Sequence, residues 1–192
     1  MKSALSFLAL LAAAAATAAA PAPERTLLAE PPRTIADFQL TDQSGKAVKL
    51  ADFRGAPVLM FFGFSHCSTA CPAALAQLRQ LEREHRAALG KTRIVIVSVD
   101  GDRDSPEAMK TWLKPLSANF IGLTGAPARV QNIAAGFSAA FYKVAGQKAG
   151  EYSVEHSSQI FLIDAKGRMR ATFFNAPIAT MAEVTHGVAT ES

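Results

Sequence analysis

The stretch PVLMFFGFSHCSTACP, residues 57–72, joins a continuously apolar segment to two closely spaced cysteines. Residues 57–62 are apolar and β-prone without interruption, which is typical of a strand covered on both faces at the centre of an α/β sheet. Small and polar residues then supply a turn, and apolar positions recur at helical spacing over residues 70–89. Cys67 and Cys71 therefore lie where the carboxyl end of a buried strand meets the amino end of a helix, a place where open α/β sheets bind ligands. The dipole of that helix favours a thiolate over a thiol.

Composition limits both the size and the class of the protein. The chain has 192 residues, 49% hydrophobic and 19% charged, which is enough for one buried core but hardly for two. Its formal net charge is +4, with 20 basic residues scattered among 16 acidic ones. Because the basic residues form no stripe, we expect no nucleic-acid partner. A single domain is predicted over residues 35–190.

The amino terminus has the pattern of a secretory signal peptide over residues 1–22: one positive charge at Lys2, then an apolar run to Ala20 and small residues suited to cleavage. That run also reaches the lower limit for crossing a bilayer, so an uncleaved anchor in the inner membrane is the alternative, and membrane contact is expected only in that case. Either reading places the domain in the periplasm or outside the cell. Residues 23–34 are rich in proline and are expected to be a poorly ordered tether.

The remaining sequence predicts a layered α/β protein. The expected elements are a hairpin over residues 35–50, the strand 57–62, a helix 70–89, a strand 93–99, a helix 105–113, a short strand 119–123, a helix 126–137, paired strands 159–163 and 169–174, and a closing helix 178–188. Ser105 is the expected cap of its helix, followed by Pro106 in the first turn. This order resembles the thioredoxin fold, a central mixed sheet flanked by helices, here with an N-terminal hairpin.

The two cysteines are suited to pairing or to chelation. Four residues apart at a helix start, Cys67 and Cys71 face the same side, with Cα atoms about 6 Å apart, inside the range of a disulfide. A purely structural disulfide is one alternative, but so short a loop constrains the unfolded chain little and stabilises little. A reversible disulfide or a metal site remains. Outside the cytoplasm such thiols oxidise unless they are kept reduced or metallated.

A metal held by two thiolates needs a further ligand, and the chain offers four histidines. His156 precedes a buried strand, at an edge where a loop can fold over the cysteine helix, so it is the best candidate. His66 adjoins Cys67 and is placed to tune its pKa, whereas His85 and His186 are expected on the surface or in packing roles. Two thiolates and one imidazole form a soft, three-ligand site that suits Cu(I). Structural zinc favours four protein ligands, and the chain has no third cysteine.

Three ordered motifs carry a family resemblance: GFSHCSTACP (63–72), SVDGDRDSPE (98–107) and EHSSQIFLIDAKGR (155–168). Together they resemble the SCO (SenC) family, thioredoxin-like copper proteins that help to assemble cytochrome c oxidase. The resemblance implies a copper ion bound by Cys67, Cys71 and His156. It also implies a metallochaperone that delivers copper to the binuclear copper centre of the oxidase. The implied partners are the copper-receiving subunit of a haem-copper oxidase and an upstream copper donor or thioredoxin-like reductant.

Some positions depart from the usual family pattern. Ser68 and Thr69 stand where many members carry Pro-Asp, and Glu155 stands where they carry aspartate. The family's aspartate-rich loop matches Asp100 and Asp104, which are candidates for contacts beside the metal or with a partner. The alternative for these two aspartates is a capped, solvated helix start.

A second function stays open from the sequence. A thiol-disulfide reductase would cycle Cys67 and Cys71 to keep the copper-binding cysteines of the oxidase reduced, and these two residues would then be catalytic. Ser158, however, stands where thioredoxin-like reductases hold a cis-proline beside their cysteines. Its presence favours the metal-binding interpretation.

Overall fold

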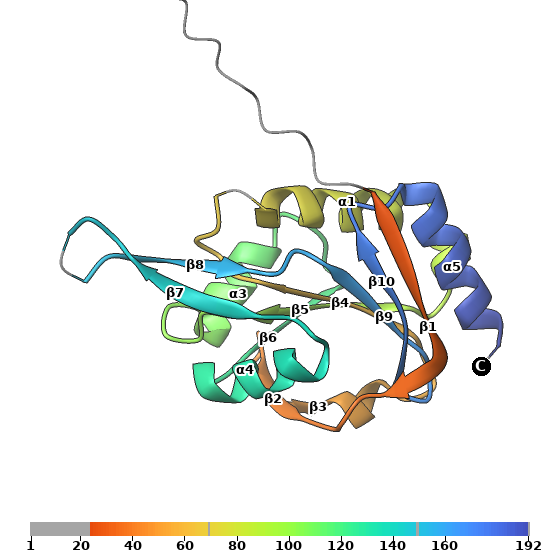
Figure 1. The fold of residues 1–192 in the computed structure, drawn as a ribbon, viewed down its shortest axis with the longest axis horizontal. Helices are drawn as coiled ribbons and strands as arrows, with labels where there is room; N and C mark the ends of the chain where they lie inside the picture. The colour runs from red at the N-terminus through yellow and green to blue at the C-terminus, as the bar shows by residue number, and fades with distance from the viewer. Residues whose placement is uncertain (1–23, 69, 149, 192) are drawn as a thin grey trace, which may run out of the picture.

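The structure, a computed structural model, describes residues 24–68, 70–148 and 150–191 (Figure 1). An eight-stranded mixed sheet has the order β1-β10-β9-β4-β5-β6-β2-β3, and β7 and β8 form a separate two-stranded sheet. The strands are β1 (Arg25–Thr34), β2 (Gln39–Asp42), β3 (Ala47–Lys49), β4 (Val58–Gly63), β5 (Arg93–Ser98), β6 (Phe120–Thr124), β7 (Phe141–Ala145), β8 (Tyr152–His156), β9 (Ile160–Ile163) and β10 (Arg168–Phe174). The helices are η1 (Leu50–Phe53), α1 (Ala70–Glu84), α2 (Arg86–Leu89), α3 (Pro106–Leu113), α4 (Pro127–Gly136) and α5 (Ile178–Thr190).

Strand β4 lies at the centre of the main sheet, as its apolar sequence predicts. It pairs in parallel with β5 and antiparallel with β9, and every one of its residues is buried. On one face Phe62 packs against Phe137, which follows α4, and against Phe161 of β9. On the other face Gly63 lies against the side chain of Cys71 in α1. Both faces of β4 are therefore covered, which is why its sequence shows no alternation of apolar and polar residues.

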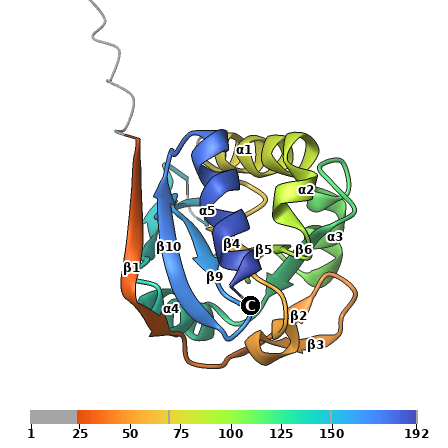
Figure 2. The ribbon, with the colours of Figure 1, turned by 90° about the vertical axis from the view of Figure 1, so that its right-hand side faces the viewer.

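Helices cover the two faces of the sheet, as the sequence predicts (Figure 2). Helices α1, α2 and α5 contact one another, and α3 packs on β6. The predicted cap of α3 is present, because the hydroxyl of Ser105 accepts a hydrogen bond from the Ala108 backbone N–H at 3.2 Å. The predicted N-terminal hairpin is present as β2 and β3.

The predicted poorly ordered tether is wrong for Arg25–Thr34. These residues form β1, which pairs antiparallel with β10 at the edge of the main sheet (Figure 2). An edge strand needs hydrogen bonds on one side only, so it tolerates proline. The register shifts between Leu28 and Arg33, and this irregularity accommodates Pro31 and Pro32. The ordered chain thus extends further towards the amino terminus than the sequence predicts.

The signal peptide or anchor predicted for residues 1–22 lies outside the described residues. Among the residues that the structure does describe, no helix is both long and apolar enough to span a bilayer.

The hairpin of β7 and β8 is an element that the sequence did not predict. It projects beside the main sheet in Figure 1, between α4 and β9 in the chain. The sequence predicted a loop before β9, whereas His156 is the last residue of β8. Its register pairs His156 with Phe141 at the base of the hairpin and Tyr152 with Ala145 towards the tip.

Candidate metal centre

The two cysteines meet at the amino end of α1. Cys67 lies in the loop that leaves β4, and Cys71 lies in the first turn of the helix, where its backbone N–H donates to Cys67 Sγ at 3.4 Å. Cys71 is only 1% exposed, whereas Cys67 is partly exposed. The absence of a side chain at Gly63 makes room for this arrangement, because a Cβ there would lie 3.0 Å from Cys71 Sγ.

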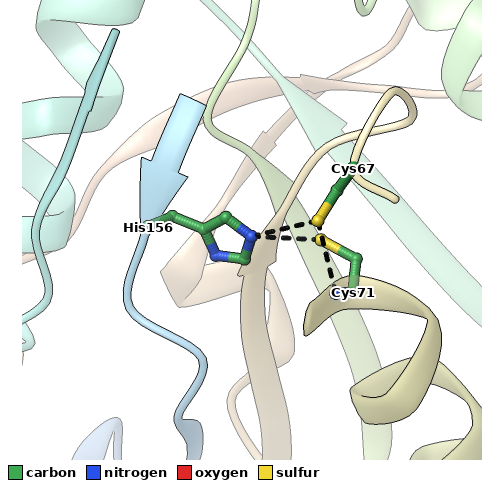
Figure 3. A group of neighbouring side chains, drawn as sticks. All are labelled: Cys67, Cys71 and His156. Atoms are coloured by element: carbon green, nitrogen blue, oxygen red, sulfur yellow. Dashed lines mark hydrogen bonds between the residues drawn. The ribbon is translucent and has the colours of Figure 1, made fainter. Parts of the chain in front are cut away.

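His156 reaches the cysteines from the end of β8 (Figure 3). Its Nε2 lies 3.2 Å from Cys71 Sγ and 3.6 Å from Cys67 Sγ. Its Nδ1 lies 3.0 Å from the carbonyl oxygen of Ser157, which can only accept, so Nδ1 carries the proton and donates it. Nε2 is thereby left with a lone pair directed at the sulfurs. Such a bond to the distal nitrogen is what usually orients a metal-binding imidazole.

Aromatic rings fix the imidazole further. Phe61 and Phe64 pack edge-on against the ring of His156, with centroids 6.0 Å and 5.6 Å away. Both phenylalanines are buried, so they exclude water from that side of the site. The apolar run of β4 contains Phe61, but no sequence signal showed that it would contact His156.

The three side chains predicted as metal ligands are brought together by the fold. The two sulfurs and the imidazole nitrogen all lie within 4.8 Å of one another. This donor set of two thiols and one imidazole fits Cu(I), a soft ion that accepts a low coordination number. The geometry is compatible with the predicted roles of Cys67, Cys71 and His156, which stay predictions.

Protonation of Cys71 differs from the prediction made from the helix dipole. Burial raises the pKa of the Cys71 thiol, and the neighbouring Cys67 adds to this, while a backbone hydrogen bond at Phe64 opposes it without reversing it. Desolvation thus outweighs the favourable helix terminus for this residue. A thiolate ligand must be deprotonated, so a metal that binds Cys71 has to displace its proton.

The two aspartates predicted from the aspartate-rich loop are buried, which contradicts the solvated alternative. Asp100 and Asp104 are both 0% exposed. The carboxylate of Asp104 accepts hydrogen bonds from the Ser65 backbone N–H at 3.0 Å, the Ser65 hydroxyl at 2.5 Å and the Ser98 hydroxyl at 2.6 Å. Because Ser65 is two residues before Cys67, Asp104 fixes the loop that carries this cysteine. The sequence did not identify Ser65 as part of the site.

The other histidines stand apart from the ligand group. His66 is exposed and its Nδ1 lies 2.8 Å from the Ser65 hydroxyl rather than against a sulfur. His85 lies between α1 and α2, and His186 is exposed on α5. Glu155 is also exposed.

The residues that replace the family's Pro-Asp are only partly described. Ser68 is exposed, and Thr69 lies outside the described residues.

Two hollows give access to the cysteines. A groove of about 510 Å³ is lined by Cys67 and Cys71 together with Arg79, Arg83 and Trp112, among others. A smaller hollow of about 170 Å³ lies on the side of His156 and is also lined by Cys67. Cys67 is therefore the ligand candidate that lines both hollows.

Comparisons with known proteins show the family of this chain. A family model described as SCO1/SenC matches residues 28–190. The human protein named "Protein SCO2 homolog, mitochondrial" is 39% identical over 135 residues, which cover 68% of this chain and 50% of that protein. A "Putative copper-binding protein" of Stutzerimonas stutzeri is 33% identical over 142 residues, covering 72% of this chain and 68% of that one.

A solved structure supports the fold. The structure of Bradyrhizobium japonicum ScoI with copper bound is 31% identical in sequence and matches with a TM-score of 0.74. The match covers 81% of this chain and 99% of that one. The thioredoxin-like fold predicted from the sequence is confirmed by this likeness and by the mixed sheet with its flanking helices. The match spans half the length of the human relative.

Proposed function

The chain belongs to the SCO1/SenC family, and we propose that it is a copper metallochaperone that delivers copper to the binuclear copper centre of cytochrome c oxidase during assembly. The observation that carries the proposal is the placing of His156 Nε2 at 3.2 Å and 3.6 Å from the two sulfurs. Copper bound in the structure of a relative 31% identical to this chain supports the choice of metal. The role in oxidase assembly rests on the family.

The three ligands have different exposures, and this suits a carrier that must also release its cargo. Cys71 is buried, so it holds the ion from the side of the core, while partly exposed Cys67 faces both hollows. A thiolate of the receiving subunit would approach through Cys67 and replace it by ligand exchange. The copper ion would pass on with no change in its oxidation state.

The proposed location follows from the signal-like sequence of residues 1–22, and the proposed partners follow from the family. We place the domain outside the cytoplasm, in the periplasm, either secreted or held at the inner membrane if residues 1–22 stay attached. The partners are the copper-receiving subunit of a haem-copper oxidase and an upstream copper donor or a thioredoxin-like reductant.

The direct test is metal content and coordination. The reduced domain, loaded with Cu(I) without oxygen, should hold one copper per chain, and X-ray absorption should show two sulfurs at about 2.2–2.3 Å, roughly the length of a thiolate bond, with one nitrogen. A spectrum without sulfur scattering at that distance rejects the site. His156→Ala should lose the nitrogen and lower the affinity for copper while the domain stays folded.

A thiol-disulfide reductase is the alternative, favoured by the closeness of the two cysteine sulfurs. The two functions make different demands on His156, which is a ligand but exchanges no sulfur. We expect His156→Ala to abolish oxidase maturation at low copper and to leave reduction of a disulfide in a model oxidase peptide nearly unchanged, whereas Cys71→Ala removes both. Normal maturation by the His156 variant in copper-limited cells would give the reductase first place.

A further inference from the structure

The strand that carries His156 is not part of the main sheet. In the part of the chain that the structure describes, strand β8 forms a ladder only with β7, so no backbone ladder joins His156 to the main sheet. Alternate residues of a strand share a face, which places Tyr152, Val154 and His156 on one side of β8. Val154 is buried, so this side is turned towards the body of the protein. A contact that holds Tyr152 in place therefore helps to set the direction of His156, together with the contacts of the imidazole itself.

Tyr152 is held by the loop that follows β5. Its hydroxyl donates to the carboxylate of Asp100 at 2.7 Å. The same carboxylate accepts a hydrogen bond from Arg103 Nε, and Arg103 Nη1 donates to the carbonyl oxygen of Tyr152 at 3.2 Å. The guanidinium also lies over the Tyr152 ring, 3.9 Å from its centroid. Arg103 thus contacts both the side chain and the backbone of the same residue on β8.

Because of burial, loss of one partner costs more here than in a surface ion pair. Asp100 is 0% exposed and the Arg103 side chain 27% exposed, so neither charge has much water to replace its partner. A second link between loop and hairpin, Lys143 to Asp102, joins side chains that are 45% and 52% exposed. Exposed pairs of this kind contribute little. Of these two links, the one through Asp100, Arg103 and Tyr152 is therefore expected to contribute more to holding the hairpin.

We propose that Asp100, Arg103 and Tyr152 form a clamp that positions the β7–β8 hairpin so that His156 meets the two cysteines. The clamp acts through His156 and touches no metal, and its importance for copper rests on the proposed function. Metal–ligand distances tolerate only about 0.2 Å of error. Without the clamp, β8 would be held at its base alone, and a rotation of the strand about that base would turn the imidazole of His156 away from the sulfurs, beyond that tolerance.

Arg103→Lys is the main test, because it keeps a positive charge beside buried Asp100 but cannot contact the carboxylate, the Tyr152 carbonyl and the ring together. By competition with a chromogenic Cu(I) chelator, the copper affinity should fall about 10- to 100-fold, as for other residues that orient a ligand. Tyr152→Phe removes only the hydroxyl and should act in the same direction. The matched control is Tyr142→Phe on the exposed face of β7, where no change is expected.

A double-mutant cycle separates positioning from general damage. In a His156→Ala background, Arg103→Lys should have no further effect on copper affinity, because the residue through which it acts is gone. Without metal, hydrogen exchange at the β8 amides should be faster in Arg103→Lys than in Tyr142→Phe, with the core strands unchanged.

Several results overturn the proposal. The clamp is rejected if Arg103→Lys and Tyr152→Phe leave copper affinity unchanged, or if their effect persists in the His156→Ala background. It is also rejected if the metal-free exchange of β8 equals that of the control. If His156→Ala itself leaves copper affinity unchanged, the proposed copper site fails, and the exchange experiment still decides whether the clamp holds the hairpin.

Discussion

Replacing Gly63 with alanine tests how closely Cys71 is packed against β4. A Cβ at this position would lie 2.6 Å from a ring carbon of Phe61 and 3.0 Å from Cys71 Sγ. Phe61 is 0% exposed and Cys71 1% exposed, so neither side chain can turn away into solvent. Overpacking of this kind costs about 1–3 kcal/mol. Alanine also lowers the conformational entropy of the unfolded chain, which offsets about 0.4–1 kcal/mol of this cost.

The expected net loss for Gly63→Ala is therefore about 1–2 kcal/mol in the free energy of unfolding, measured by urea denaturation. For a domain of this size the melting temperature should fall by about 2–8 °C. Because relief of the clash displaces Cys71 Sγ, the copper affinity should fall as well. The control is Gly187→Ala in α5, where a Cβ meets no atom within 4 Å and helix propensity should add about 0.5–1 kcal/mol. Equal stability of the two variants would refute the packing argument.

Three further predictions concern charge and protonation. Burial alone would raise the pKa of Asp164, but hydrogen bonds and the charge of Arg168 hold it below its ordinary value. The ionised carboxylate stabilises the folded protein at pH values above its unfolded pKa of about 3.9. This stabilisation is lost as the pH falls through the lower pKa of the folded state. Asp164→Asn should thus lower the free energy of unfolding by about 1–3 kcal/mol at pH 7. In urea denaturation at acid pH the difference from the native protein should vanish, and a difference that stays constant with pH contradicts this. Asp104→Ala leaves the Ser65 N–H and hydroxyl without their acceptor and should cost about 2–4 kcal/mol in chemical denaturation, whereas an unchanged midpoint argues against the network. Since Cu(I) must displace the proton of Cys71, the binding constant for Cu(I) should rise about tenfold per pH unit from that proton alone. Competition with a chelator at pH 6, 7 and 8 measures this rise, and a binding constant that does not change with pH excludes a protonated Cys71.

Local pattern predicted the elements that form the centre of the molecule. The apolar run of β4, the cap at Ser105 and the pairing of β9 with β10 each have a signal within a few neighbouring residues, and the structure confirms them. The three ligand candidates could also be chosen, because Cys67 and Cys71 lie at a strand–helix junction and His156 precedes a buried strand.

The missed features depend on contacts between distant parts of the chain. Strand β1 contains two prolines, and only the position at a sheet edge makes it a strand. Four of the five residues of β7 are exposed, so its sequence lacks the alternation that marks a strand. The protonated state of Cys71 follows from burial that no local pattern reveals. The same holds for the contact of Asp104 with Ser65, which are 39 residues apart.

Because the β7–β8 hairpin lies outside the main sheet, evolution can change the candidate metal site and the central sheet independently of each other. Strands β9 and β4 pair directly, so the central sheet is complete without the hairpin. Yet the hairpin supplies the imidazole nitrogen, one of the three ligand atoms of the proposed copper site. Changes of its length or sequence can therefore alter metal preference while the inherited core is left as it is. For an engineer, the hairpin is the segment to exchange between relatives when a new metal specificity is wanted on the same scaffold.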